Sequence, residues 1–365
     1  MEVKLASGME AAREAAALIA GGGIVAFPTE TVYGLAADAF NPSAVARVYA
    51  AKGRPGDNPL ILHVASPDAF FELAESPPAY AYALIKAFWP GPLTLVAKKK
   101  PGLPPWVGGH PKSAADTVGV RMPSHPLAKA VIEASGCVVA APSANLAGTP
   151  SPTLAEHVAA DFKHGEIDFI LDGGAVPGGL ESTVVDVTGP RPVILRPGAI
   201  TAEMVAAATG LETHGQALPA NENEKETGPP SAPPRSPGMK YRHYAPKAPM
   251  TLLIGSESDI AAYVLNQSVK EQSLRIGVLV TAETEAVLRR SLSETCHEYR
   301  HLEFINLGSK AAPETIAHNL YASLRKFDAQ GVDVIYAEGL MQEGLGAAIM
   351  DRMRKAAEGR VLSFS

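Results

Sequence analysis

The turn at residues 28–35, PTETVYGL, follows an apolar run at residues 24–27. Polar turns that leave the end of a buried strand are where α/β proteins build their sites. An ordinary strand-to-loop exit with capping threonines explains the same residues equally well.

Two cations, Lys52 and Arg54, lie in the Gly- and Pro-containing stretch KGRPGDNP, which also holds Asn58. In such a loop both side chains can point the same way and hold a triphosphate, Arg as a bidentate fork and Lys as a point charge. A solvated helix C-terminus, where the dipole favours cations, is the alternative and is slightly favoured by spacing alone. His63 follows in the apolar run LILHV, where a lone histidine is more often a hydrogen-bonded core residue.

Residues 117–121, TVGVR, alternate in polarity, which places Thr117, Gly119 and Arg121 on one face of a strand. An Arg and a Thr on one sheet face indicate an anion or carboxylate contact. A half-exposed strand without function is about equally compatible with the pattern.

Hydroxyl and amide groups gather after a further apolar run at residues 138–141. Ala141 is followed by Ser143 and Asn145, and Ser151 stands where a helix N-cap is expected. Hydroxyls and free backbone N–H groups at a helix start favour phosphate binding, although pure capping explains Ser151 as well. The glycine-rich loop 173–182 then ends at Ser182, and Arg196 ends the next predicted strand.

The elements that position these residues alternate between strand and helix. Apolar runs at 24–27, 60–64, 93–97, 118–122, 138–141, 169–171, 184–187 and 193–195 predict strands, several joined only by turns, which indicates a mixed sheet. Ser7 with Glu10 forms a predicted capping box, and Asn41 with Pro42 begins a second helix.

The C-terminal part has a more regular pattern. Runs at 252–254, 276–280, 304–307 and 334–336 are each followed by a helical segment, which predicts a doubly wound parallel sheet. Between the two parts, residues 219–238 are rich in proline and contain no branched aliphatic or aromatic residue, so they predict a linker. We therefore expect an α/β protein with a catalytic domain at 1–210, a linker at 211–249 and a smaller domain at 250–365.

Composition excludes several classes of protein. The chain has 365 residues, 46% hydrophobic and 19% charged, which fits a folded protein of two domains and not a disordered one. A net charge of −6 argues against nucleic-acid binding by bulk charge, and two cysteines exclude a disulfide framework. The P-loop, serine hydrolase and zinc protease motifs are missing, and no signal or membrane segment is recognisable, so we expect a cytoplasmic protein.

Taken together, these segments resemble YrdC/TsaC-type L-threonylcarbamoyl-AMP synthases. PTETVYGLA, Lys52 with Arg54, Ser143 with Asn145, GTPSPT and GGLEST occur in the order found in that family, and SPGMKYRHYAP at 236–246 resembles the signature of its long, two-domain form. The resemblance implies a YrdC-like twisted mixed sheet and a C-terminal Rossmann-like domain. It also implies a nucleotidyltransferase that converts L-threonine, bicarbonate (or CO2) and ATP to threonylcarbamoyl-AMP and pyrophosphate.

The resemblance also assigns roles to residues. It places threonine among Thr31, His63, Arg121, Ala141 (by its backbone) and Ser182, with Arg121 pairing with the carboxylate. It places ATP among Lys52, Arg54, Asn58, Thr117, Ser143, Asn145, Ser151, Arg196 and Tyr244. Lys52 and Arg54 would be the catalytic cations, and Tyr244 would fold over the nucleotide as part of a lid. Mg²⁺ would arrive on the triphosphate, since no clustered carboxylates suggest a protein-built metal site.

The implied product passes to the tRNA threonylcarbamoyl transfer machinery, with tRNA itself a weak partner at most. Two alternatives are an RNA-binding module, using Lys98–Lys100 and Lys112, and a carbamoyltransferase of hydrogenase maturation. The acidic net charge argues against the first, and the lack of zinc-finger cysteines argues against the second.

Overall fold

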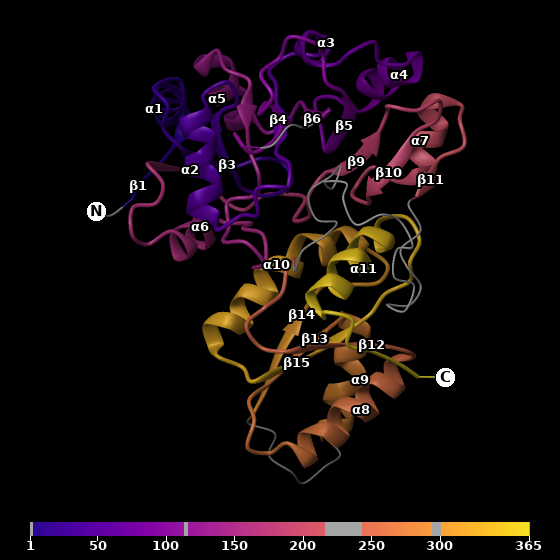
Figure 1. Cartoon of the computed structure of the whole chain (residues 1–365). Coiled ribbons are helices and arrows are strands. Elements are labelled where there is room, and N and C mark those ends of the chain that lie inside the picture. Colours follow the sequence, from indigo (N-terminus) through magenta and orange to yellow (C-terminus); the bar gives the residue numbers. More distant parts are fainter. Residues whose placement is uncertain (1–2, 113–115, 216–242, 294–300, 365) are drawn as a thin grey trace. The chain divides into compact units, whose positions relative to one another are not determined.

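The computed structural model describes residues 3–112, 116–215, 243–293 and 301–364, which divide into two compact units (Figure 1). The N-terminal unit comprises residues 1–147 and 151–241, and the C-terminal unit comprises 148–150 and 242–365. The predicted linker at 219–238 lies outside the described residues, as do Lys112's neighbours at 113–115 and the first seven residues of SPGMKYRHYAP.

The N-terminal unit is built on a mixed sheet, as the sequence predicts. Eleven strands are described in it, in the order β1-β8-β2-β3-β7-β4-β6-β5-β9-β10-β11. They are β1 (Lys4–Ser7), β2 (Val25–Phe27), β3 (Gly34–Asp38), β4 (Ile61–His63), β5 (Leu93–Lys98), β6 (Thr117–Arg121), β7 (Val139–Ala140), β8 (Phe169–Asp172), β9 (Thr183–Asp186), β10 (Val193–Arg196) and β11 (His214–Gly215).

Seven helices are described in this unit: α1 (Gly8–Ala20), α2 (Pro42–Lys52), α3 (Asp68–Leu73), α4 (Ala79–Phe88), α5 (Pro126–Ser135), α6 (Ala155–Asp161) and α7 (Ala202–Thr209). Asn41 caps α2 as predicted, because its side chain accepts the N–H groups of Ser43 and Ala44. The predicted capping box of α1 is wrong in its hydrogen bond: Ser7 is at the N-cap, but its side chain makes no cap bond.

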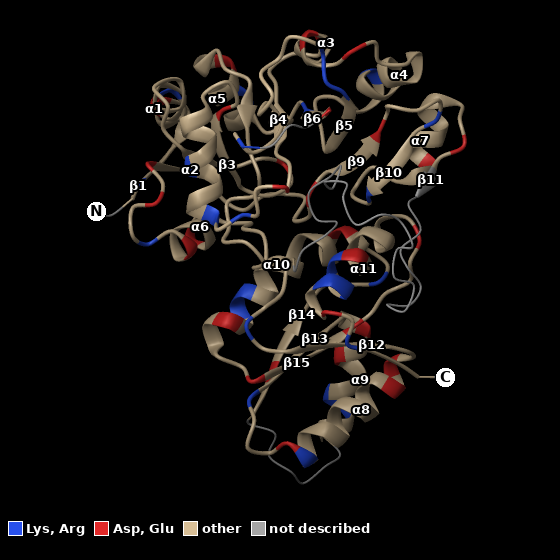
Figure 2. Ribbon diagram, viewed as in Figure 1, with Lys and Arg blue, Asp and Glu red and all other residues tan. Residues whose placement is uncertain are grey.

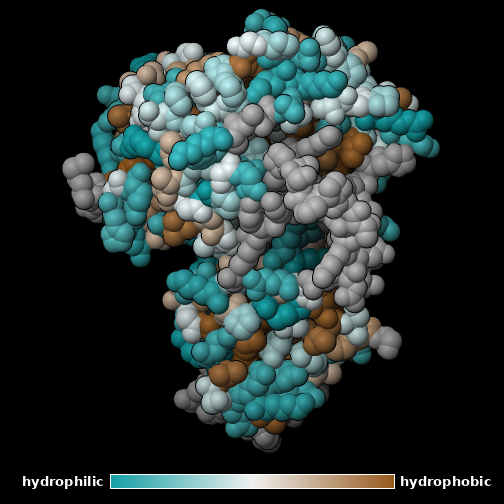
Figure 3. Space-filling view, in the orientation of Figure 1, coloured by the Kyte–Doolittle hydropathy of each residue, from teal (hydrophilic) through white to brown (hydrophobic). Residues whose placement is uncertain are grey.

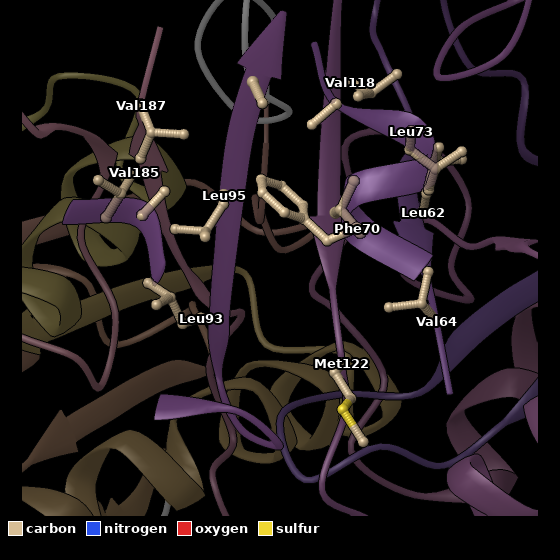
Figure 4. Close-up of a cluster of buried hydrophobic side chains, with 14 of the residues drawn as sticks. Leu62, Val64, Phe70, Leu73, Leu93, Leu95, Val118, Met122, Val185 and Val187 are labelled. Atoms are coloured by element: carbon tan, nitrogen blue, oxygen red, sulfur yellow. The ribbon is translucent and has the colours of Figure 1, made fainter. Parts of the chain in front are cut away.

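An apolar core packs against one face of the central strands β4, β6 and β5. Leu62 of β4, Val118 of β6 and Leu95 of β5 point into one apolar cluster with Phe70 of α3 (Figure 4). Because side chains alternate between the two faces of a strand, the neighbouring residues of these strands must point to the opposite face. Packing of the apolar residues therefore fixes which residues of these strands point to the opposite face of the sheet.

The C-terminal unit holds a parallel sheet, as expected for a doubly wound fold. Its strands β12 (Met250–Ile254), β13 (Ile276–Val280), β14 (Leu302–Asn306), β15 (Val334–Glu338) and β16 (Val361–Ser363) lie in the order β14-β13-β15-β12-β16. Helices α10 (Pro313–Gln330) and α11 (Leu345–Ala356) cover one face, and α8 (Glu257–Lys270) and α9 (Ala282–Ser293) cover the other (Figure 1).

Charges of both signs are interspersed over each unit (Figure 2). On the face seen in Figure 3, hydrophilic residues predominate and hydrophobic residues form small, separate patches. Across the described parts of the chain, every helix is too short or too polar to cross a membrane.

Candidate active site

The floor of the site is the face of β4, β6 and β5 that points away from the apolar cluster. In the sheet register, His63 pairs with Arg121, and Arg121 pairs with Thr94. Paired residues of neighbouring strands lie side by side on one face. Three residues of three different strands, two of them predicted site residues, therefore form one row. The predicted common face of Thr117, Gly119 and Arg121 agrees with this register.

Arg121 is held by contacts from three directions. Its Nε donates to the Gly91 carbonyl at 3.2 Å and its Nη1 donates to Thr31 Oγ1 at 2.9 Å. Its Nη2 lies 2.6 Å from Glu30 Oε1, and both side chains are largely buried, at 5% and 12% exposed. The structure thus brings together Thr31 and Arg121, which the resemblance assigns to one substrate.

Thr31 is fixed by the turn in which it lies. Thr29 Oγ1 is 2.8 Å from Thr31 Oγ1, and Thr29 Oγ1 also donates to the Val32 carbonyl at 2.7 Å. Hydroxyls that bond backbone groups two or three residues away stabilise such turns. The turn between β2 and β3 is therefore a built part of the site, not a plain connection.

Glu30 was missed by the sequence reasoning, although it stands in the motif that was singled out. Burial acts to raise the pKa of Glu30, but the Arg121 charge and hydrogen bonds, including one from the Ser124 N–H at 3.1 Å, bring it below its ordinary value. The carboxylate is therefore ionised at neutral pH. Its partner is distant in sequence, so the only available signal was a lone carboxylate in a turn of threonines.

His63 is a buried, neutral residue in this row. Burial first, and then the neighbouring Arg121 charge, lower the pKa of His63 from 6.5 to about 3. Its Nδ1 lies 3.2 Å from the Ile61 carbonyl, and its ring packs edge-on against Phe27 at 6.1 Å. The hydrogen-bonded core histidine weighed from the sequence is what the geometry shows, and it lies beside Arg121.

This burial predicts a pH dependence of stability. Between pH values of about 3 and 6.5, the unfolded chain binds a proton at His63 that the folded chain does not, so stability falls as the pH falls through this window. We expect His63 to contribute up to ~1.4 kcal/mol per pH unit to the free energy of unfolding.

Urea unfolding of wild type and His63→Asn over this window measures the contribution. The variant should show a flatter slope, whereas His164→Asn, at an exposed position, should match wild type. Equal slopes in wild type and His63→Asn would contradict the assignment.

Ser182 and Arg196 form a second cluster that joins the first. Arg196 Nε donates to the Ser182 carbonyl at 3.1 Å and its Nη2 donates to Ser182 Oγ at 3.2 Å. Ser182 Oγ also lies 2.8 Å from Thr94 Oγ1, and Thr94 is the cross-strand neighbour of Arg121. Thr94 is a second missed residue, and its signal was a threonine at the interior of an otherwise apolar strand.

Lys52 differs from its prediction. It is the last residue of α2, it is 2% exposed, and its Nζ donates to the carbonyls of Ser143 and, at 2.5 Å, Asn145. The helix C-terminus weighed from the sequence is where Lys52 lies, but the side chain is buried and not solvated, because backbone carbonyls of a distant segment provide partners for its charge. Three predicted nucleotide residues, Lys52, Ser143 and Asn145, are nevertheless brought together.

Arg54 braces its own loop. Its Nε donates to the Asn58 carbonyl at 3.2 Å and its Nη2 donates to the Pro59 carbonyl at 2.7 Å. Tyr49 donates to the same Asn58 carbonyl at 2.8 Å. Lys52 and Arg54 therefore contact different backbone segments, and the anion clamp, one of the two interpretations of their spacing, stays a prediction.

Ser151 is also placed differently. Helix α6 begins at Ala155 with Leu154 at its N-cap, so the predicted N-cap role of Ser151 is wrong. Ser151 is 1% exposed and its Oγ donates to Glu181 Oε1 at 2.6 Å. Glu181 was missed because the glycine-rich loop was judged by its glycines and its final serine.

Ala141 and Thr117 contact different strands of the N-terminal sheet. Ala141 is buried and its N–H donates to the Ile61 carbonyl at 2.9 Å, next to the strand that carries His63. Thr117 begins β6 opposite Lys98 and lines a groove of about 450 Å³ with Lys98, Lys99, Lys100, Glu75 and Asp116.

Tyr244 lies in the C-terminal unit. It is 5% exposed, has a φ of 63°, stacks on Tyr321 at 5.3 Å and lies under the Arg352 guanidinium at 5.6 Å. Its assignment to a nucleotide lid stays a prediction.

The carboxyl edge of the C-terminal sheet, where doubly wound folds commonly bind ligands, carries ion pairs. Lys310 Nζ lies 2.6 Å from Glu257 and 2.7 Å from the fully buried Glu338. Glu338 also accepts the Thr281 N–H and the Thr284 hydroxyl, both at 2.8 Å. Within the described ranges of the chain, His, Cys, Asp and Glu side chains form no group of three or more that could hold a metal ion.

Comparison with known proteins defines the class. Two family models match: one described as "Telomere recombination" over residues 17–198, and one described as "Threonylcarbamoyl-AMP synthase, C-terminal domain" over residues 200–358. The chain is thus built from the two modules of a two-domain synthase.

Relatives match nearly the full length. The threonylcarbamoyl-AMP synthase of Bacillus subtilis is 46% identical over 96% of this chain and 93% of its own, and that of Pyrococcus abyssi is 42% identical over 96% and 95%. The crystal structure of P. abyssi Sua5 complexed with L-threonine has a TM-score of 0.85 at 40% identity and covers 100% of both chains. The chain belongs to the threonylcarbamoyl-AMP synthase family.

Proposed function

We propose that the protein joins L-threonine, bicarbonate (or CO2) and ATP into threonylcarbamoyl-AMP and releases pyrophosphate, together with water when the carbon comes from bicarbonate. The observation that carries this proposal is the buried row of His63, Arg121 and Thr94 with Thr31. The chain that holds this row aligns over its full length with P. abyssi Sua5, whose crystal structure is a complex with L-threonine. Arg121 supplies the fork that a carboxylate requires.

The proposed reaction needs no protein nucleophile. An oxygen of the threonine carbamate attacks the α-phosphate of ATP, and the bond from that phosphorus to the bridging oxygen of pyrophosphate breaks. This is nucleotidyl transfer, in which a protein contributes positioning and stabilises charge on the phosphates. ATP enters with Mg²⁺ on its triphosphate.

In this proposal the threonine end comprises Thr31, His63, Arg121, Ala141 and Ser182. The ATP end comprises Lys52, Arg54, Asn58, Thr117, Ser143, Asn145, Ser151, Arg196 and Tyr244. The Arg196–Ser182–Thr94 contacts join the two sets of side chains in the N-terminal unit. Lys52 and Arg54 donate to backbone carbonyl oxygens, so in this proposal they also support the ATP end by holding that backbone in place.

The test is pyrophosphate release with threonine and bicarbonate each present or omitted, with threonylcarbamoyl-AMP identified by mass spectrometry. Release and product that require both substrates support the proposal. Release that needs neither would indicate a plain ATPase. The proposed product then serves cytoplasmic tRNA threonylcarbamoyl transfer.

The groove at Lys98–Lys100 does not favour the RNA-binding alternative. Glu75 and Asp116 line the same groove, and Lys100 lies 3.8 Å from Glu72. Acidic groups among the lysines oppose a phosphate backbone. A titration with tRNA at varied salt, without ATP or threonine, would reveal tight binding if this interpretation were right.

The lid assignment predicts the behaviour of a truncated chain. Three apolar clusters among the described residues of the N-terminal unit contain only residues before Pro219, so we expect a chain that ends there to fold. Without Tyr244, we expect its pyrophosphate release to fall about tenfold or more, because water enters an unsealed site. Circular dichroism melting checks folding, and full-length Tyr244→Ala should reproduce the loss. Full activity in the truncated protein would contradict the lid.

A further inference from the structure

We propose that Glu30 makes the threonine pocket selective for a zwitterion, so that it rejects carboxylic acids of the same shape that lack an α-ammonium group. This inference rests on the proposed function, in which Arg121 receives the threonine carboxylate. It concerns a residue outside the set that the family resemblance assigns to substrate.

The first step is the local charge. Glu30 and Arg121 are 2.6 Å apart and largely buried, so they form a neutral pair. His63 and His125 both lie close enough to act on Glu30 electrostatically, and burial lowers the pKa of each, so neither is charged at neutral pH. Among these four side chains, Arg121 therefore carries the one positive charge and Glu30 the one negative charge.

The second step is that Arg121 has other supports. The Gly91 carbonyl and Thr31 hold Nε and Nη1, which fixes the plane of the guanidinium without Glu30. Glu30 is itself held from two segments: Ser124 donates to its carboxylate, and the Gly178 N–H donates to its carbonyl at 2.9 Å. Its position is therefore built into the site, although orienting Arg121 does not require it.

The third step is that stability does not explain the pair. A buried ion pair contributes little compared with apolar residues of similar volume, because both charges lose their hydration. Pockets tolerate such costs where recognition needs charge. A carboxylate beside the arginine that binds a substrate carboxylate must act on the ligand.

The action is electrostatic. A free amino acid carries a carboxylate for Arg121 and an ammonium that Glu30 attracts. A ligand with only the carboxylate brings a net negative charge beside Glu30, and like charges a few ångströms apart near a protein surface repel each other strongly. Replacing Glu30 with Gln removes both the attraction and the repulsion, so the two ligands should respond in opposite directions.

The experiment is isothermal titration calorimetry of the full chain with L-threonine and with (R)-3-hydroxybutanoate, which keeps the carboxylate and the hydroxyl of threonine. We expect wild type to prefer threonine by about 100-fold or more. In Glu30→Gln, threonine should bind about tenfold more weakly and hydroxybutanoate about tenfold more tightly. Glu30→Asp, which keeps the charge, should retain most of the preference.

Glu14→Gln is the matched control, because Glu14 also lies 2.6 Å from a cation, Lys4, but on the exposed surface. It should leave both affinities unchanged. Equal weakening of both ligands in Glu30→Gln would show that Glu30 only supports Arg121 and would overturn the proposal. Equal affinity of wild type for the two ligands would overturn it without any variant. Lack of threonylcarbamoyl-AMP synthesis in wild type would instead contradict the proposed function, since calorimetry does not depend on turnover.

Discussion

Arg121→Lys is expected to lower kcat/KM for threonine about 100-fold or more while the protein remains folded. Lysine keeps the positive charge beside Glu30, so the carboxylate stays paired. It cannot reproduce contacts to the Gly91 carbonyl, Thr31 and Glu30 while also presenting a fork to a substrate carboxylate. Steady-state kinetics with threonine varied at saturating ATP measures the loss.

Arg121→Leu separates stability from activity. It leaves Glu30 buried without its cation, which we expect to cost ~3–5 kcal/mol in the free energy of unfolding. The double variant Arg121→Leu/Glu30→Leu removes both charges and should regain much of that stability, yet stay inactive. Arg47→Lys is the matched control, since Arg47 pairs with Asp168 at 2.9 Å on a half-exposed surface, and it should leave activity unchanged. Near-normal kcat/KM in folded Arg121→Lys would refute the carboxylate assignment.

The strand pattern predicted the sheet face of Arg121 correctly because the cause of that face is local. Alternation in TVGVR fixes which face each side chain takes, and the apolar residues Val118 and Val120 hold the opposite face in the core. The same logic predicts the strands around it. Strand β3, Gly34–Asp38, was missed because its small residues carry little strand propensity and its position comes from pairing with β2 and β7.

Partners that are distant in sequence explain the other misses. Glu30 meets a guanidinium that lies far along the chain, and Ser151 meets Glu181, 30 residues away. A local sequence pattern does not indicate a contact between distant segments. The family resemblance assigned roles only to positions that match the family's binding residues. The structure adds Glu30, Thr94 and Glu181, which contact the assigned residues, so the candidate site extends beyond the positions that the resemblance assigns.

Lys52→Ala is expected both to destabilise the N-terminal unit and to abolish adenylate formation. The buried ammonium donates to carbonyls of the segment that carries Ser143 and Asn145, and hydrogen bonds to charged groups contribute ~1.5–3 kcal/mol each. Losing two of them should lower Tm by roughly 10 °C in a unit of this size. The loosened segment also displaces two proposed ATP contacts, so activity should fall about 100-fold or more.

Differential scanning fluorimetry and pyrophosphate release measure the two effects on the same preparations. Lys86→Ala is the matched control: Lys86 occupies the last turn of α4 as Lys52 does in α2, but its side chain is exposed, so both readouts should match wild type. A stable but inactive Lys52→Ala would restore the simpler assignment drawn from the sequence, in which the lysine contacts phosphate directly and supports nothing else. If Lys52→Ala melts early but regains activity at saturating ATP, Lys52 acts by holding the segment that carries Ser143 and Asn145. Bound ATP would then stabilise the folded state that the lost hydrogen bonds no longer stabilise.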